Sequence, residues 1–161
     1  MTTHKKYSLK RTLLENTQPV DAFQETLASL VDSSSFDGYA DELILDHGEC
    51  YTILQLALDE ESGEHVWVNS LSTVDKQGKP SEGCYRKGYA KEMMLKLTQA
   101  ADQHGVILEL IAAPPPRLKR QLPSLPDKDE LARFYAQHGF VETDRNMAQV
   151  YMSRSPLNNR G

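Results

Sequence analysis

The sequence has few cysteines, no long apolar segment and no excess of basic residues. Its two cysteines, Cys50 and Cys84, form neither a CxxC motif nor a Cys/His cluster, so the usual zinc sites are excluded. Two isolated cysteines suit free thiols in a reducing compartment better than a disulfide between them. No apolar run approaches the roughly 18 residues that a membrane helix needs, and no signal-peptide core follows the first residues. We therefore expect a cytoplasmic protein without a metal site or a membrane partner.

Charge and composition set further bounds. The formal net charge of −5 argues against direct binding to nucleic acid, which usually requires a basic excess. Hydrophobic content of 39% and charged content of 25% are ordinary for a globular protein. The simplest organisation for 161 residues is one domain over 1–161, with 153–161 as a frayed tail.

Apolar periodicity predicts a mixture of strands and helices. Strands are expected at 5–14, 42–45, 50–58, 65–71, 106–111, 140–143 and 147–152, and helices at 19–31, 88–103 and 127–138. The residues at 33–38 should break the first helix, Gly105 should cap the second, and Asp127 with Glu130 should open the third as a capping box. This order is typical of an α+β or mixed α/β fold, in which the crossover 66–111 joins neighbouring parallel strands.

One short stretch has the features of a phosphate site. The turn Tyr85-Arg86-Lys87-Gly88-Tyr89-Ala90 is basic, contains glycine and opens a helix. A helix N-terminus has backbone N–H groups without partners and a partial positive charge, and glycine lets a ligand approach closely. The turn also follows the first strand of the crossover, where ligands of open α/β sheets bind. An ordinary solvated turn is the alternative.

A second stretch makes the comparison with a known family specific. Together, 85–90 and Leu131-Ala132-Arg133-Phe134-Tyr135-Ala136-Gln137-His138-Gly139-Phe140 resemble the pyrophosphate loop and the second motif of the GCN5-related N-acetyltransferases (GNAT), and Leu71-Ser72-Thr73 resembles the end of that family's fourth strand. The resemblance covers roughly 5–152. It implies a mixed, mostly antiparallel sheet with a central parallel strand pair splayed to bind acyl-CoA, and helices on both faces.

The resemblance also implies an activity, the transfer of an acetyl group from acetyl-CoA, as cosubstrate, to a primary amine by direct attack. Tyr135 would protonate the CoA thiolate, because a phenol keeps its proton at neutral pH. Packing of the last helix is the alternative role for Tyr135. Contacts to acetyl-CoA are implied for backbone groups of Leu71, Thr73, Arg86, Lys87, Gly88, Tyr89 and Ala90.

The sequence departs from the family pattern at three places. Tyr85 stands where Arg or Gln is usual, and Arg86 or Lys87 could supply the charge instead. Lys128 stands where Asn is frequent. Many members of the family have a glutamate on the fourth strand that acts as general base. The corresponding position in this sequence is approximately that of Trp67. The general base is therefore unassigned, with four candidates by residue type: Glu109, His138, Glu49 and His47.

Other functions stay open. An inactive acyl-CoA-binding sensor or interaction module is one alternative, and an unrelated α/β domain that binds another phosphorylated ligand, or none, is another. The amine acceptor is a small molecule or a protein, and the resemblance also allows a homodimer. The proline-rich loop 112–126 carries Arg117, Lys119 and Arg120, which we expect to flank the acceptor or to reach the 3′-phosphate of CoA.

Overall fold

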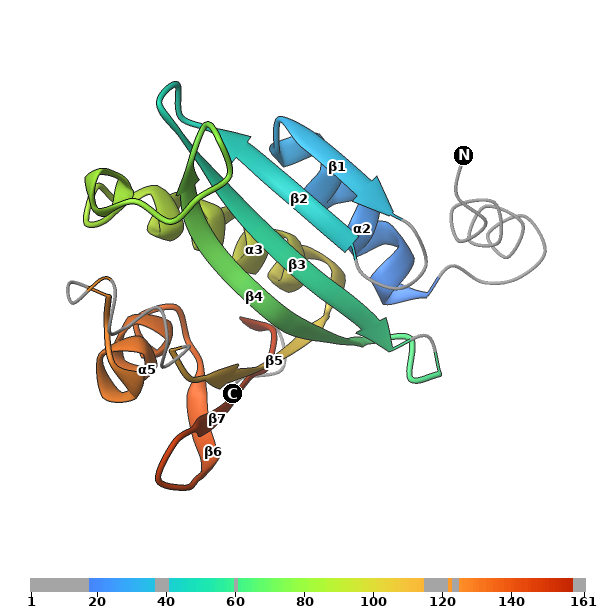
Figure 1. Cartoon of the computed structure of the whole chain (residues 1–161). Coiled ribbons are helices and arrows are strands. Elements are labelled where there is room, and N and C mark those ends of the chain that lie inside the picture. The colour runs from blue at the N-terminus through green and yellow to red at the C-terminus, as the bar shows by residue number, and fades with distance from the viewer. Residues whose placement is uncertain (1–17, 37–40, 60, 115–121, 123–124, 158–161) are drawn as a thin grey trace.

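A seven-stranded sheet and three helices make up the described structure (Figure 1). The computed structural model describes residues 18–36, 41–59, 61–114, 122 and 125–157. The predictions for 5–14 and for most of the loop 112–126, including Arg117, Lys119 and Arg120, lie outside these residues. The strands are β1 (Ser33–Phe36), β2 (Asp41–Asp46), β3 (Cys50–Asp59), β4 (His65–Asp75), β5 (Ile107–Ala112), β6 (Val141–Arg145) and β7 (Val150–Arg154), and the helices are α2 (Pro19–Leu30), α3 (Tyr89–His104) and α5 (Lys128–Ala136), with one 3-10 turn, η1 (Glu82–Cys84).

The sheet is mixed and mostly antiparallel, with the order β1-β2-β3-β4-β5-β7-β6. Only β4 and β5 run parallel among the described strands, and they pair from His65–Val68 to Ile107–Leu110. The predicted crossover is therefore confirmed, with α3 as its helix. Within the described residues, no helix is both long and apolar enough to cross a membrane.

All three described helices belong to one core. The strands bury alternate residues, as the pattern BiBiBe of β2 shows, so one sheet face is covered and the other carries partly exposed side chains. Apolar side chains of α2, α3 and α5 join a single buried cluster with those alternate residues. The expectation of helices on both faces is therefore wrong for the described helices. The uncovered face carries polar and partly exposed side chains such as Glu42, Gln55 and Trp67.

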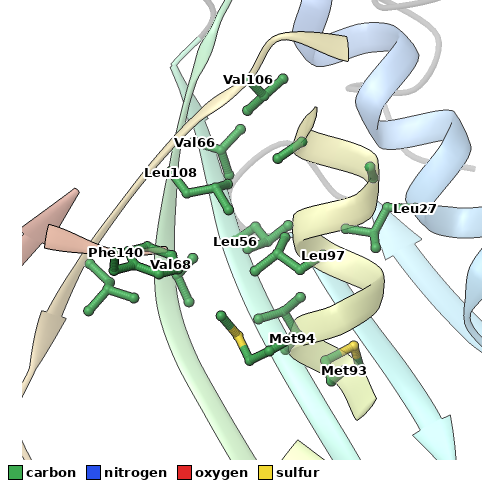
Figure 2. Packing of buried hydrophobic residues seen from close by; sticks show 14 of the residues in the cluster. Leu27, Leu56, Val66, Val68, Met93, Met94, Leu97, Val106, Leu108 and Phe140 are labelled. Atoms are coloured by element: carbon green, nitrogen blue, oxygen red, sulfur yellow. The ribbon is translucent and has the colours of Figure 1, made fainter. Parts of the chain in front are cut away.

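Helix α3 lies across the centre of this core. Its Met93, Met94 and Leu97 are fully buried, and Figure 2 shows Leu97 beside Leu56 of the sheet. Full burial of such a side chain stabilises the folded state by about 1.5–3 kcal/mol. The predicted apolar stripe therefore fixes which side of α3 faces the sheet and where its N-terminus points.

Strand β1 was not expected. The residues at 33–38 are turn formers by type, yet Ser33–Phe36 pairs with β2 as an edge strand. Its side chains are exposed or half-buried, so they add little to its stability. The strand is stabilised mainly by its backbone hydrogen bonds with β2. A neighbouring strand thus overrides a local turn preference.

An ion pair joins the far ends of α3 and α5. Arg154 on β7 is buried and donates two hydrogen bonds of 2.9 Å to the carboxylate of Asp102 near the C-terminus of α3. Its Nε donates a third, of 2.7 Å, to the backbone oxygen of His138, just after α5. One side chain therefore fixes where both helices end.

Candidate functional site

The strands β4 and β5 separate at the centre of the sheet. Their pairing ends at Val68 and Leu110, although β4 continues to Asp75 and β5 to Ala112. The register of β3 and β4 shifts here, so that Asn69 is an extra residue in β4, a bulge of the kind that bends a strand. Figure 1 shows the two strands diverging, with α5 on the β5 side. The result is a groove of about 710 Å³ between the two strands.

The N-terminus of α3 lies at one side of this groove. Gly88 is its N-cap residue with a φ of +79°, and no side chain caps the helix. Arg86 also has a left-handed φ, of +60°. The first backbone bond of the helix runs from Glu92 N–H to the Gly88 oxygen, and in the described part of the chain the N–H groups of Tyr89 and Ala90 have no acceptor. These donors line the groove and are suited to an anion.

The charge of the groove agrees with such a ligand. Among the described residues that line it, three are basic, Arg86, Lys91 and Arg133, and one is acidic, Glu130. The Glu130 carboxylate already accepts a hydrogen bond of 3.0 Å from the backbone N–H of Asp127. A positively lined groove in a chain of net charge −5 favours a negatively charged ligand.

Tyr135 lines the opposite side of the groove from the last turn of α5. It is 8% exposed and packs edge-to-face against Phe134 and Phe140. Burial raises the pKa of its phenol from 10.0 to about 12, because ionisation in an apolar setting is costly. No group in the described part of the chain forms a hydrogen bond with its hydroxyl. A buried phenol that keeps its proton and faces a groove without a partner is suited to donate that proton to a ligand.

The structure brings most of the predicted ligand contacts into this groove. The predicted residues that line it are Leu71, Thr73, Arg86, Gly88, Tyr89, Ala90 and Tyr135. Between Asn69 and Thr73, the β5 side of β4 has no partner strand among the described strands, so this stretch can pair with an extended ligand. Further along, Val74 forms an isolated antiparallel bridge with Pro80.

Lys87 is not among the lining residues. Its ammonium forms a hydrogen-bonded ion pair of 2.8 Å with Glu49 in the turn between β2 and β3. This bond raises the pKa of Lys87 and lowers that of Glu49. Arg86, rather than Lys87, therefore presents a basic side chain to the groove, which sequence spacing alone could not decide.

None of the four candidate bases lines the groove. Glu109 lies on the uncovered sheet face and pairs with His65 at 3.0 Å. His138 lines a separate hollow between α3 and α5, and its Nε2 is buried without a hydrogen-bond partner in the described part of the chain. Burial, followed by the charges of Lys91 and Arg154, lowers its pKa. Glu49 and His47 belong to the β2–β3 turn.

Three charged residues of the groove were missed, namely Lys91, Glu130 and Arg133. Lys91 is the third residue of α3, where a first-turn side chain lies beside the helix terminus. Glu130, Arg133 and Phe134 are spaced i, i+3 and i+4 and therefore share a helix face. Helical spacing applied to polar residues would have found Glu130 and Arg133.

The two cysteines form a disulfide, which corrects the expectation of free thiols. Cys50 at the start of β3 and Cys84 in η1 have Cα atoms 6.0 Å apart, although 34 residues separate them in the sequence. Cys84 also lines the groove. Counting cysteines could not reveal this pairing, because it depends on how the 75–84 loop folds back onto β3. Within the described residues, no cluster of three or more His, Cys, Asp or Glu side chains is arranged to hold a metal ion.

Comparisons with known proteins add no identification to this geometry. The chain matches no protein-family model and no curated protein.

Proposed function

We propose that this protein is an acetyl-CoA-dependent N-acetyltransferase with a GNAT-like fold. The observation that carries the proposal is the position of Tyr135, a buried, protonated phenol in a groove that is also lined by the uncapped N-terminus of α3. A buried phenol or an uncapped helix N-terminus alone would fit several kinds of ligand site. A positively charged anion cradle and a proton donor in one groove fit an acyl-CoA thioester, which carries a diphosphate and releases a thiolate.

Each side of the groove supplies one part of the binding. Backbone N–H groups at the start of α3, together with Arg86 and Lys91, would hold the diphosphate. The stretch of β4 before the Val74–Pro80 bridge, which includes Leu71 and Thr73, would pair with the amide groups of the pantetheine arm. Extended ligands commonly bind to an open strand edge in this way.

The proposed reaction requires only one proton donor from the protein. Acetyl-CoA would supply an activated acetyl group as a thioester. The amine nitrogen attacks the carbonyl carbon, the C–S bond breaks, and Tyr135 gives its proton to the sulfur as negative charge develops there. The amine loses a proton, which restores the phenol through solvent or a base that we leave unassigned. Positioning of the two reactants supplies the rest of the acceleration.

One observation favours a second candidate, an acyl-CoA-binding module without catalysis. In the described part of the groove the only carboxylate, Glu130, is engaged in the capping box, and no histidine lines the groove. An amine that arrives protonated would find no group there to accept its proton.

Thermal unfolding with and without acetyl-CoA tests the shared part of both candidates. Ligand at a hundred times its dissociation constant stabilises a protein by about 2.7 kcal/mol, which is a measurable rise in melting temperature. No shift at saturating acetyl-CoA would reject both. A panel of small-molecule amines and lysine peptides then separates the two candidates, because the enzyme releases CoA thiol with at least one acceptor and the module with none.

A further inference from the structure

The loop that opens α3 is held from outside the groove by the turn between β2 and β3. Two side chains of this turn contact the loop: His47 stacks on Tyr89 with ring centroids 3.9 Å apart, and Glu49 pairs with Lys87 at 2.8 Å. The disulfide from Cys50 to Cys84 adds a covalent link at the next residue of the turn. We call these three paired contacts the loop clamp.

The backbone of the loop is held in an uncommon conformation. Residues 85–88 lie between η1 and α3 in neither helix nor strand. Two of them, Arg86 and Gly88, have left-handed φ angles of +60° and +79°. For Arg86 this conformation costs about 1–2 kcal/mol, so surrounding contacts must stabilise it. The clamp acts on the loop from both ends, at Cys84 and at Tyr89.

The turn holds its own shape. His47 forms a hydrogen bond of 2.7 Å with the hydroxyl of Thr52, a buried residue of β3. The backbone N–H of Gly48 donates to the Asp46 carboxylate at 2.9 Å. The clamp therefore connects the loop to the rigid part of the sheet.

We propose that the Cys50–Cys84 disulfide positions the 85–90 loop for its diphosphate ligand and that its reduction lowers the affinity for that ligand. This inference rests on the proposed function, because it concerns the same anion cradle. A dithiol supplies the two electrons: the S–S bond breaks, each cysteine sulfur takes a proton, and the dithiol closes to its own disulfide. The exposed ion pair and the half-buried ring stack remain, but both are non-covalent, and they allow the loop to leave its left-handed conformation more often.

The same geometry links ligand and disulfide in the other direction. Both sulfur-bearing residues are buried, Cys50 at 2% and Cys84 at 4% exposure, and Cys84 lines the groove. By thermodynamic linkage, a ligand that binds the oxidised form more tightly must stabilise the disulfide by the same factor.

The test compares acetyl-CoA binding by the oxidised protein with binding after reduction by dithiothreitol. Acetyl-CoA is a suitable probe because its sulfur is acylated and cannot exchange with the disulfide. Calorimetry should show a dissociation constant at least about fivefold higher after reduction, the lower end of typical coupling between sites. A redox titration should show the reciprocal effect, and a tenfold coupling corresponds to a disulfide potential about 30 mV more negative with ligand bound.

Two variants and a second ligand keep the test specific. Cys50→Ser should bind acetyl-CoA like the reduced wild type and should not respond to dithiothreitol. If Cys50→Ser does not fold, oxidised His47→Ala should still bind more weakly than oxidised wild type. S-acetylpantetheine lacks the diphosphate, so its affinity should not change on reduction.

The outcomes separate the two levels of the proposal. Equal acetyl-CoA affinity in both redox states overturns the clamp and leaves the proposed function standing. An equal loss for acetyl-CoA and S-acetylpantetheine also overturns it, because the whole groove rather than the loop would have loosened. No binding of acetyl-CoA in either state overturns the proposed function and the inference with it.

Discussion

The N-termini of α3 and α5 both lie at the groove, but they differ in whether a side chain caps their first backbone N–H groups. At α5, the Asp127 carboxylate accepts a hydrogen bond of 2.8 Å from Glu130 N–H, and Glu130 returns one of 3.0 Å to Asp127 N–H. At α3, the N-cap residue is Gly88, which has no side chain to offer. Side chains of α5 therefore bond to backbone N–H groups at its own start, whereas the first N–H groups of α3 can bond to a ligand.

The two helices therefore contribute different groups to the groove. A capped terminus has fewer donors left for an anion, so α5 contributes side chains instead, above all Tyr135 from its last turn. A helix with glycine as its N-cap is about a few tenths of a kcal/mol less stable than one with a good cap. In α3 that loss is acceptable, because the burial of Met93, Met94 and Leu97 stabilises the helix independently of its cap. Changes at α3 should therefore affect affinity, and changes at Tyr135 should affect turnover.

The largest expected effect is on turnover. Tyr135→Phe keeps the buried ring and removes only the hydroxyl, so acetyl-CoA binding should be retained while the rate of acetyl transfer falls by about a hundredfold to ten-thousandfold. Steady-state kinetics with an acceptor found in the amine panel, combined with calorimetry for acetyl-CoA, measures the two separately. Turnover like that of the wild type would remove Tyr135 from the mechanism and leave α5 with a packing role.

The next effect is on stability, at the far ends of the same two helices. Arg154→Ala leaves the Asp102 carboxylate and the His138 oxygen without their buried donor, so the free energy of unfolding should fall by about 3 kcal/mol. Denaturant unfolding measures it. Arg145→Ala is the matched control: it removes an arginine from an exposed network with Glu142 and Asp129 and should change stability little. Similar losses in both variants would contradict the assigned importance of burial.

The third prediction concerns the N-cap of α3, where an aspartate like that at the N-cap of α5 can be introduced. Gly88→Asp places a carboxylate at the open terminus, where it competes for the free N–H groups and repels the diphosphate. An added Cβ meets no atom within 4 Å, and aspartate adopts the strained left-handed conformation at less cost than most residues. The dissociation constant of acetyl-CoA should rise by about tenfold or more, as measured by calorimetry.

Gly88→Asn is the control for charge at this position, because it has nearly the same shape and the same tolerance of left-handed φ. It should lose less affinity than Gly88→Asp. Equal losses would mean that side-chain bulk, not charge, matters at the start of α3.

The smallest effect is at the capped terminus. Asp127→Ala removes the side-chain cap of α5 and should lower the free energy of unfolding by about 1 kcal/mol, measured in denaturant. Acetyl-CoA affinity should not change, since Asp127 does not line the groove. A loss of affinity as large as that of Gly88→Asp would end the distinction between the two termini.

Features that depend on neighbours along the chain could be predicted from the sequence. Periodicity and caps placed α3 between Gly88 and Gly105, both left-handed in the structure, and placed the start of α5 at Asp127. The crossover between β4 and β5 followed from the order of elements. These features are predictable because their interactions span only a few residues.

Features that depend on distant segments became visible only in the folded structure. Pairing with β2 made a strand of 33–36, and the fold of the 75–84 loop brought Cys84 to Cys50. Lys87 pairs with Glu49 of the β2–β3 turn, so Arg86 is the basic residue that lines the groove. The strand register places Glu109 on the uncovered sheet face. In each case the deciding partner is far away in sequence, so no local pattern in the chain records it.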